Sequence, residues 1–458
     1  MGLGAVCVLV LAGLAALLLL GDSGSDHPDE WDPRVTDLVA FVEDERELEF
    51  DHPVHIDFLT PEEYSDAARA DEAELTDEDR AAIEDDEAVL RALGLLEDDV
   101  DLFESSNELS DGGTLAYYDD ATDRITVRGT EMTVDLEGTL VHELTHALQD
   151  QHFDLGRLYE FEDTGQSSVF RAVVEGDASL VEEAYVGSLD EDDLDDYLAT
   201  VDEQVEQAPF EEVPSILTAS FGAPYALGTP FVGIVEADGG WEAVNEMLGA
   251  PPASEVELLD PERWFEPTEL EDVELPPADD DVEVIDESDF GSISLYLMLA
   301  ARMDAHVAFD AARGWAGDAY RTTRDDGTVC VELEVVGADD EASEAIGEAL
   351  DAWADGTDAD VSRDGGRTTL TSCDPGTDGL SAPVTDPLDA IALPTSRSYS
   401  MYGTMLQLGA TPEEGACVGD LVVTQLPLEV LAVPDPTDEQ LDQYVDAMTS
   451  AGQKCGVL

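Results

Sequence analysis

Two histidines and a glutamate within residues 140–155 carry the clearest chemistry in this sequence. His142, Glu143 and His146 form an HExxH motif. On a helix, residues at i and i+4 lie one turn apart on the same face, so both imidazoles can bind one metal ion. Glu143, next to the first histidine, is placed to accept a proton from a water molecule at that ion. The motif therefore predicts a metal centre that activates water.

Two residues compete to be the third protein ligand that a catalytic zinc usually has. Glu175 follows His146 on a second predicted helix, residues 168–185, among apolar neighbours where an unpaired charge would be costly. His152 has the spacing of the third histidine in HExxHxxGxxH enzymes, but Gln149 stands where their chain turns at a glycine. We favour Glu175 and keep His152 as the alternative.

Ordinary zinc chemistry then suggests hydrolysis of a peptide bond. Zinc lowers the pKa of water to near 7 and polarises a carbonyl group, while Glu143 would act as general base and pass the proton to the leaving amine. A further donor should stabilise the oxyanion. The candidates for that donor are Tyr225, His306 and Tyr185, and the sequence does not rank them.

The segment before the motif predicts a β-hairpin that would position it. In residues 114–129, two runs of alternating apolar residues flank a turn at residues 119–123. A free strand edge there could pair with an extended peptide by strand addition, although an ordinary covered edge is an equal alternative. Further upstream, residues 54–59 read as a strand, and Thr60 and Pro61 as the start of a helix.

The rest of the chain predicts an α+β fold. We expect a zincin-like domain over residues 35–320, largely helical after a small sheet, and a small C-terminal α/β region over residues 321–458. Residues 292–314 read as one long helix. The C-terminal region should contain strands at 328–336, 368–372, 401–408 and 421–433, and helices at 341–353 and 438–450.

The charge of the chain indicates an adaptation to high salt. Its 458 residues include 18 basic and 110 acidic ones, for a net charge of −92. Such a charge repels itself in dilute buffer, but at molar salt the Debye length falls to about 3 Å. We interpret the chain as a folded protein of the haloarchaeal kind. The charge argues against nucleic acids and anionic membrane surfaces as partners.

The two ends of the chain indicate export. Residues 3–20 are apolar and uncharged, which suits a membrane anchor or a signal peptide over residues 1–22, followed by a linker over residues 23–34. Four later cysteines suggest two disulfides, and of the three connectivities we favour the sequential one. These cysteines are Cys330, Cys373, Cys417 and Cys455.

The stretch from about residue 100 to residue 353 resembles the HExxH zinc metallopeptidase-like surface proteins of haloarchaea and bacteria, of gluzincin type. The resemblance lies in the AYYD hairpin, the HELTHALQDQHFDL motif, the VEGDA segment around Glu175 and the later PYALGTPFV, GW and GWAGD segments. It implies His142, His146 and Glu175 as zinc ligands and Glu143 as general base. Thermolysin-type enzymes orient the first histidine with an aspartate four residues after the ligand glutamate, whereas this chain has Ser179 there.

The leading hypothesis is therefore an extracellular, membrane-anchored or secreted zinc peptidase that acts on peptides or proteins. The alternative is a non-catalytic structural or binding protein of the cell surface, built on a zincin scaffold.

Overall fold

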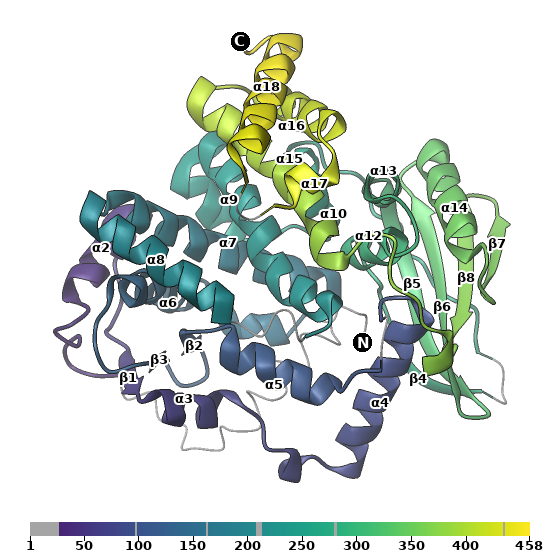
Figure 1. The fold of residues 1–458 in the computed structure, drawn as a ribbon, viewed down its shortest axis with the longest axis horizontal. Helices are drawn as coiled ribbons and strands as arrows, with labels where there is room; N and C mark the ends of the chain where they lie inside the picture. Colours follow the sequence, from purple (N-terminus) through teal and green to yellow (C-terminus); the bar gives the residue numbers. More distant parts are fainter. Residues whose placement is uncertain (1–26, 97–98, 162–163, 208–212, 279–281, 434–435) are drawn as a thin grey trace.

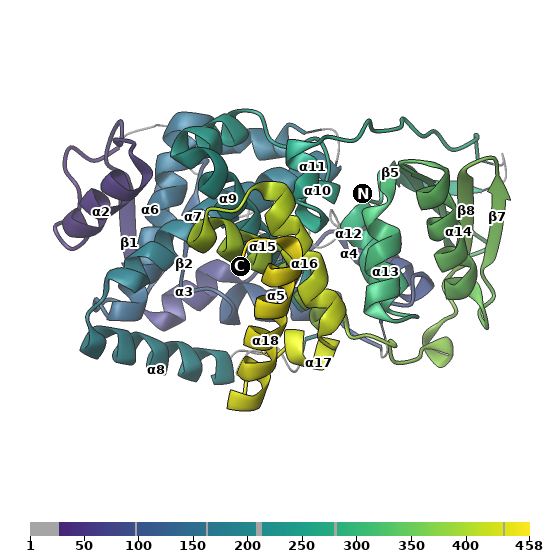
Figure 2. The ribbon, with the colours of Figure 1, turned by 90° about the horizontal axis from the view of Figure 1, so that it is seen from above.

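The described part of the chain forms a mixed α+β fold in which helices predominate, as predicted (Figure 1). The computed structural model describes residues 27–96, 99–161, 164–207, 213–278, 282–433 and 436–458. A three-stranded and a five-stranded sheet lie on opposite sides of the molecule, with helices between them (Figures 1 and 2). The apolar run at residues 3–20 lies outside the described residues, and no helix within them is long and apolar enough to cross a membrane.

The three-stranded sheet contains the predicted hairpin. Its strands are β1 (His55–Leu59), β2 (Ala116–Asp119) and β3 (Arg124–Arg128), in the order β1-β3-β2. β2 pairs antiparallel with β3, and β1 pairs parallel with β3 on the other side. Because β3 is the central strand, β2 is an edge strand of this sheet.

The helices around this sheet begin largely where the sequence predicts. Thr60 caps the helix that starts at Pro61, and its side chain and that of Glu63 form a capping box. The HExxH helix and the helix that carries Glu175 are also where we expected them. These first helices are α2 (Thr36–Arg46), α3 (Pro61–Ala68), α4 (Asp77–Ala92), α5 (Leu102–Gly112), α6 (Val134–Phe153), α7 (Thr164–Ser188) and α8 (Glu191–Gln207).

The middle of the chain is helical as well. The long helix α9 (Ser215–Gly249) is interrupted at Gly240, where φ is 68°. The single helix predicted for residues 292–314 is wrong: the structure has two helices, because Asp304 caps the start of the second one by accepting from the His306 N–H. The remaining helices of this part are α10 (Val256–Leu259), α11 (Glu262–Phe265), α12 (Ser292–Ala300) and α13 (Ala305–Arg313).

The five-stranded sheet is antiparallel throughout. Its strands are β4 (Glu283–Ser288), β5 (Trp315–Asp325), β6 (Thr328–Gly337), β7 (Asp360–Asp364) and β8 (Arg367–Cys373), in the order β4-β5-β6-β8-β7. Every second residue of β6 is buried, and α4 and α14 (Asp340–Ala354) pack against this strand. Cys330 lies opposite Cys373 in the β6–β8 register and forms a disulfide with it. The strands predicted at 328–336 and 368–372 and the helix at 341–353 are confirmed.

The last part of the chain is helical, so the strands predicted at 401–408 and 421–433 are wrong. It consists of α15 (Pro387–Leu408), α16 (Pro412–Gln425), α17 (Leu428–Leu431) and α18 (Asp438–Cys455). In residues 401–408 the buried positions are Met401, Thr404 and Met405, which share one face of a helix. Cys417 and Cys455 join α16 to α18, so the sequential disulfide pairing is confirmed.

Two hydrophobic cores meet at the helices of the HExxH motif and Glu175. One core is formed by α2, the three-stranded sheet and the apolar face of α6, which includes Val141, Leu144 and Leu148. The larger core contains α7 and α9 and extends to the five-stranded sheet and α15. The predicted metal ligands therefore lie where the two cores adjoin. The helix of the two histidines packs into one core, and the helix of Glu175 packs into the other.

Candidate metal centre

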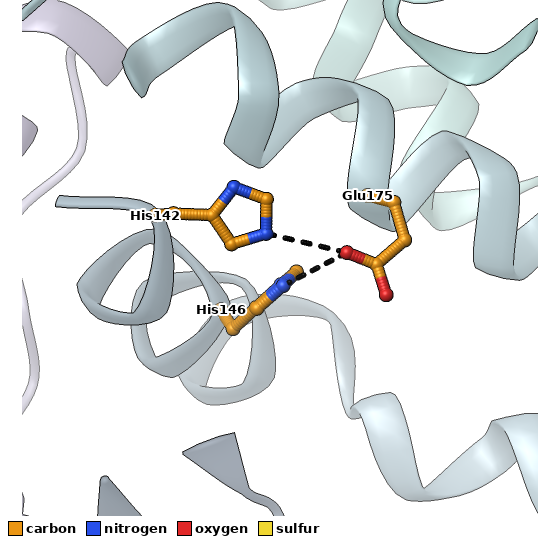
Figure 3. Close-up of side chains that lie close together, drawn as sticks. All are labelled: His142, His146 and Glu175. Carbon is orange, nitrogen blue, oxygen red and sulfur yellow. Dashed lines mark hydrogen bonds and ion pairs between the residues drawn. The ribbon is translucent and has the colours of Figure 1, made fainter. Parts of the chain in front are cut away.

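The side chains of His142, His146 and Glu175 meet in one place between α6 and α7 (Figure 3). Glu175 Oε2 lies 3.3 Å from His142 Nε2 and 3.2 Å from His146 Nε2. One ligand atom from each of the three residues lies within 4.8 Å of the others, and the residues are only 7–9% exposed. Within the described ranges no other group of three histidines, cysteines or acids has this spacing.

The convergence depends on how closely α7 and α9 pack behind Glu175. A Cβ on Gly176 would lie 2.3 Å from the carbonyl carbon of Gly228, and a Cβ on Gly228 would lie 1.9 Å from the carbonyl oxygen of Ala172. Both glycines are therefore needed for the backbones to cross at this distance. Gly176, next to Glu175, is thus required by the close packing of α7 against α9.

His152, the alternative third ligand, lies elsewhere. α6 continues through Phe153, and the His152 ring is exposed, with Nε2 2.9 Å from the backbone oxygen of Glu49. Because position 149 is glutamine and not glycine, the chain does not leave the helix there, and the His152 imidazole points away from the other two. The structure thus brings Glu175, and not His152, to the HExxH pair.

The spacing and chemistry of the three side chains suit a tetrahedral divalent ion. Two donors that are each about 2.0–2.1 Å from such an ion lie about 3.3 Å apart. The carboxylate oxygen has this separation from both imidazole nitrogens. Two nitrogens and one oxygen are also a common ligand set for zinc, and three protein ligands leave the fourth position open.

The electrostatics of the three side chains favour charge on each of them when no ion is bound. Burial opposes ionisation of Glu175, but the two imidazoles hold its pKa well below the usual value. Burial likewise opposes charge on His142 and His146, but nearby carboxylates, Glu175 foremost, raise the pKa of both. A bound cation would replace the protons that this cluster otherwise holds.

Glu143 lies beside this cluster and keeps one oxygen without a hydrogen-bond partner. It is 6% exposed, and within the described structure Oε2 has no donor. Burial raises the pKa of Glu143, while the two imidazoles and the backbone N–H of Tyr118 on β2 oppose the rise. A carboxylate in this setting can accept a proton more readily than one in water.

His146 is oriented by a chain of buried side chains that the sequence analysis did not find. Its Nδ1 lies 2.9 Å from Gln149 Oε1, and Gln149 Nε2 donates to the Val174 carbonyl and to Asp177. Asp177 in turn forms an ion pair of 2.8 Å with Arg46 of α2. Because both N–H groups of the Gln149 amide are used, its oxygen must face His146. That oxygen accepts from Nδ1–H, so Nε2 points at Glu175; it carries a proton when no ion is bound, and a bound cation would take the place of that proton.

His142 has a weaker support. Glu182 Oε2 lies 3.3 Å from His142 Nδ1, without hydrogen-bond geometry, and Tyr197 of α8 donates to the other oxygen of Glu182 at 3.5 Å. Glu182 is thus the acid beside Nδ1 of His142, whereas the fourth residue after Glu175 is Ser179. It lies seven residues, about two turns, after Glu175, so it shares that helix face, and this spacing could have identified it.

Of the three candidates for an oxyanion donor, the structure brings one to the cluster. The ring of Tyr225 lies 6.0 Å from that of His142, and burial, followed by the charge of Glu175, raises its pKa. Tyr185 instead donates to Glu137, and His306 contacts the backbone oxygen of Val423 on α16. Arg171, which the sequence analysis also missed, lies one turn before Glu175 with Nε 3.9 Å from its Oε1.

Comparisons with protein-family models, with curated proteins and with solved structures found no match for this chain.

Proposed function

We propose that this protein is an extracellular zinc-dependent peptidase of gluzincin type, with His142, His146 and Glu175 as the zinc ligands. The observation that carries the proposal is the approach of Glu175 Oε2 to both imidazole Nε2 atoms, at 3.2 and 3.3 Å, beside a buried acid with an unused oxygen. A zinc ion held there would lower the pKa of water and polarise the scissile carbonyl.

The protein's own residues would then handle the proton. As a water molecule adds to the carbonyl carbon, Glu143 takes its proton, and as the carbon–nitrogen bond breaks, Glu143 gives that proton to the leaving amine. The raised pKa of Glu143 supports this double role. A carboxyl group whose pKa is closer to the working pH can both accept the proton from water and release it to the amine. Tyr225 is the candidate to donate to the oxyanion.

The position of β2 supports a peptide as the substrate. β2 is the edge strand of its sheet, and the backbone N–H of Tyr118 faces Glu143 from that edge. An extended peptide that pairs with β2 would pass directly over the general base. The edge strand therefore gives the proposal a route for the polypeptide.

The two disulfides support an extracellular location. Cys330–Cys373 and Cys417–Cys455 both lie in the part of the chain that follows the candidate metal centre. Disulfides of this kind persist mainly in oxidising surroundings.

The low exposure of the ligands supports a second candidate, a surface protein whose metal only holds α6 and α7 together. All three ligands are less than 10% exposed, as in structural sites. Structural zinc sites, however, have four protein ligands, whereas this cluster offers three.

Glu143→Gln separates the two candidates. The full chain in molar salt should contain about one zinc per chain and cleave an unfolded protein, with loss of cleavage after chelation. Glu143→Gln should retain the zinc but lower turnover by about 100- to 10,000-fold, because a general base is lost. Glu191→Gln, the same change on an exposed acid of α8, is the control and should not alter either quantity. Zinc bound without cleavage of any protein would support the structural role.

A further inference from the structure

Arg171 places a positive charge directly beside the ligand carboxylate. It lies one turn before Glu175 on α7, and its Nε is 3.9 Å from Glu175 Oε1. The other oxygen of that carboxylate, Oε2, is the one that approaches the two imidazoles. The guanidinium therefore borders the metal position on the far side of Glu175.

The guanidinium of Arg171 makes no hydrogen bond to any residue that the structure describes. A separation of 3.9 Å is an ion-pair contact and too long for a hydrogen bond. The other arginines pair with carboxylates or donate to backbone carbonyls, except Arg302, which lies over the Trp353 ring. Up to five N–H donors of Arg171 are thus available to a ligand.

The surroundings of Arg171 make it selective for an anion. Its side chain is 21% exposed, so it can be reached while being only partly screened by salt. When a divalent cation neutralises Glu175, Arg171 loses the carboxylate partner with which it forms an ion pair among the described residues. In a chain with a net charge of −92, such an excess of positive charge is unusual.

We propose that Arg171 binds a carboxylate of the substrate, so that the site prefers peptides with a carboxylate next to the scissile bond. The fork of a guanidinium matches a carboxylate in two parallel hydrogen bonds. Because Arg171 contacts a metal ligand and consecutive Cα atoms are only about 3.8 Å apart, that carboxylate must lie within about one residue of the cleaved bond. It can be the C-terminal carboxylate or the side chain of an aspartate or glutamate. The proposal rests on the proposed function.

A pair of small thiols tests the inference without turnover. In the cobalt-loaded full chain, the thiolate–cobalt absorption band reports the binding of 3-mercaptopropionate and of its amide. The carboxylate should bind at least about tenfold more tightly, because a charge-assisted hydrogen bond is about twice as strong as a neutral one. In Arg171→Met the two affinities should agree within about twofold, and Arg171→Lys, which keeps the charge, should restore part of the difference.

A matched substitution shows whether the effect is local. Arg80→Met removes an exposed arginine of α4 that pairs with Glu72, and it should leave the thiol preference unchanged. Equal affinities of the two thiols for the unmodified chain would overturn the proposal. So would a methionine variant that binds cobalt more weakly but keeps the preference, since Arg171 would then only position Glu175.

Peptides identify the source of the carboxylate. Substrates that differ only in a free or amidated C-terminus, and others with aspartate or asparagine next to the cleaved bond, should differ in kcat/KM in one of the two pairs. That difference should fall in Arg171→Met chiefly through KM. If no peptide is cleaved, the proposed function fails, but the thiol preference still tests Arg171.

Discussion

The two histidines of the candidate metal centre are held in different ways. His146 is tied by hydrogen bonds to Gln149 and through it to Asp177 and Arg46, all three of which are at most 1% exposed. His142 has only a contact at 3.3 Å to Glu182, whose side chain is 26% exposed and which also accepts from Tyr197 of α8. Both histidines are buried, but the support of His146 lies wholly in the protein interior, whereas that of His142 includes a side chain that reaches solvent. We call these the buried side and the open side.

This difference suggests a division of labour between the two sides. The buried side fixes the tautomer and ring orientation of one ligand and anchors it to α2, far away in the sequence. The open side can adjust when an ion or a substrate arrives, since the contact of Glu182 with His142 is not a hydrogen bond and Glu182 reaches solvent. Substitutions on the buried side should therefore have larger effects than those on the open side.

Breaking the buried ion pair should have the largest effect. In Arg46→Met the carboxylate of Asp177, which is 0% exposed, loses its 2.8 Å partner. An uncompensated buried charge typically costs about 3–5 kcal/mol. Urea unfolding in molar salt should show a fall of that size in the free energy of unfolding, with weaker zinc binding in the variant that still folds.

An exposed pair provides the control for this measurement. Arg80→Met breaks the pair with Glu72, in which both side chains are exposed, and should change the free energy of unfolding by less than about 1 kcal/mol. If Arg46→Met costs no more than Arg80→Met, the buried side is not the rigid one.

Removal of the metal should have the next largest effect. An ion that binds the folded chain alone, present at 100 times its dissociation constant, stabilises it by about 2.7 kcal/mol. A chelator should remove this contribution and lower the urea midpoint. An identical midpoint with and without the chelator would mean that the three side chains do not hold an ion in the folded chain.

The sequence named the three side chains that converge at the candidate centre because each has a signal on its own helix. His142 and His146 lie one turn apart, and Glu175 lies in an apolar helix, so spacing and hydrophobicity were sufficient. The hydrogen-bonded side chains that support His146 could not be predicted in this way. Arg46 and Asp177 are far apart in the sequence, and in a chain with 110 acidic residues nothing distinguishes Asp177 before the fold is known.

The same reasoning explains where the predicted fold was right and wrong. The hairpin and the amphipathic helices have their own periodicity, and they were found. Met401 and its neighbours form a short apolar run in which a buried helix and a buried strand look alike. The parallel pairing of β1 with β3 depends on segments that are distant in the sequence, so no local pattern announces it.

Loss of the Gln149 acceptor should weaken metal binding without a large loss of stability. Gln149→Leu keeps a side chain of similar size at a position that is 1% exposed, but it no longer accepts from His146 Nδ1 or donates to Asp177. Substitution of such supporting residues typically lowers metal affinity by about 10- to 100-fold. Competition with a chromophoric chelator would measure the dissociation constant of zinc.

Glu182→Gln is the matched substitution on the open side and should have the smallest effect. The contact with His142 Nδ1 is 3.3 Å long and lacks hydrogen-bond geometry, and a glutamine can still offer its oxygen to the imidazole. Because Glu182 is partly exposed and its contact with His142 is not a hydrogen bond, we expect the change to cost less than about 1 kcal/mol, so the zinc dissociation constant should rise by less than about fivefold. If Glu182→Gln weakens zinc binding more than Gln149→Leu does, Glu182 orients the histidines more strongly than Gln149 does, which contradicts the proposed difference between the two sides. A ratio of the two dissociation constants near one would place equal support on both histidines.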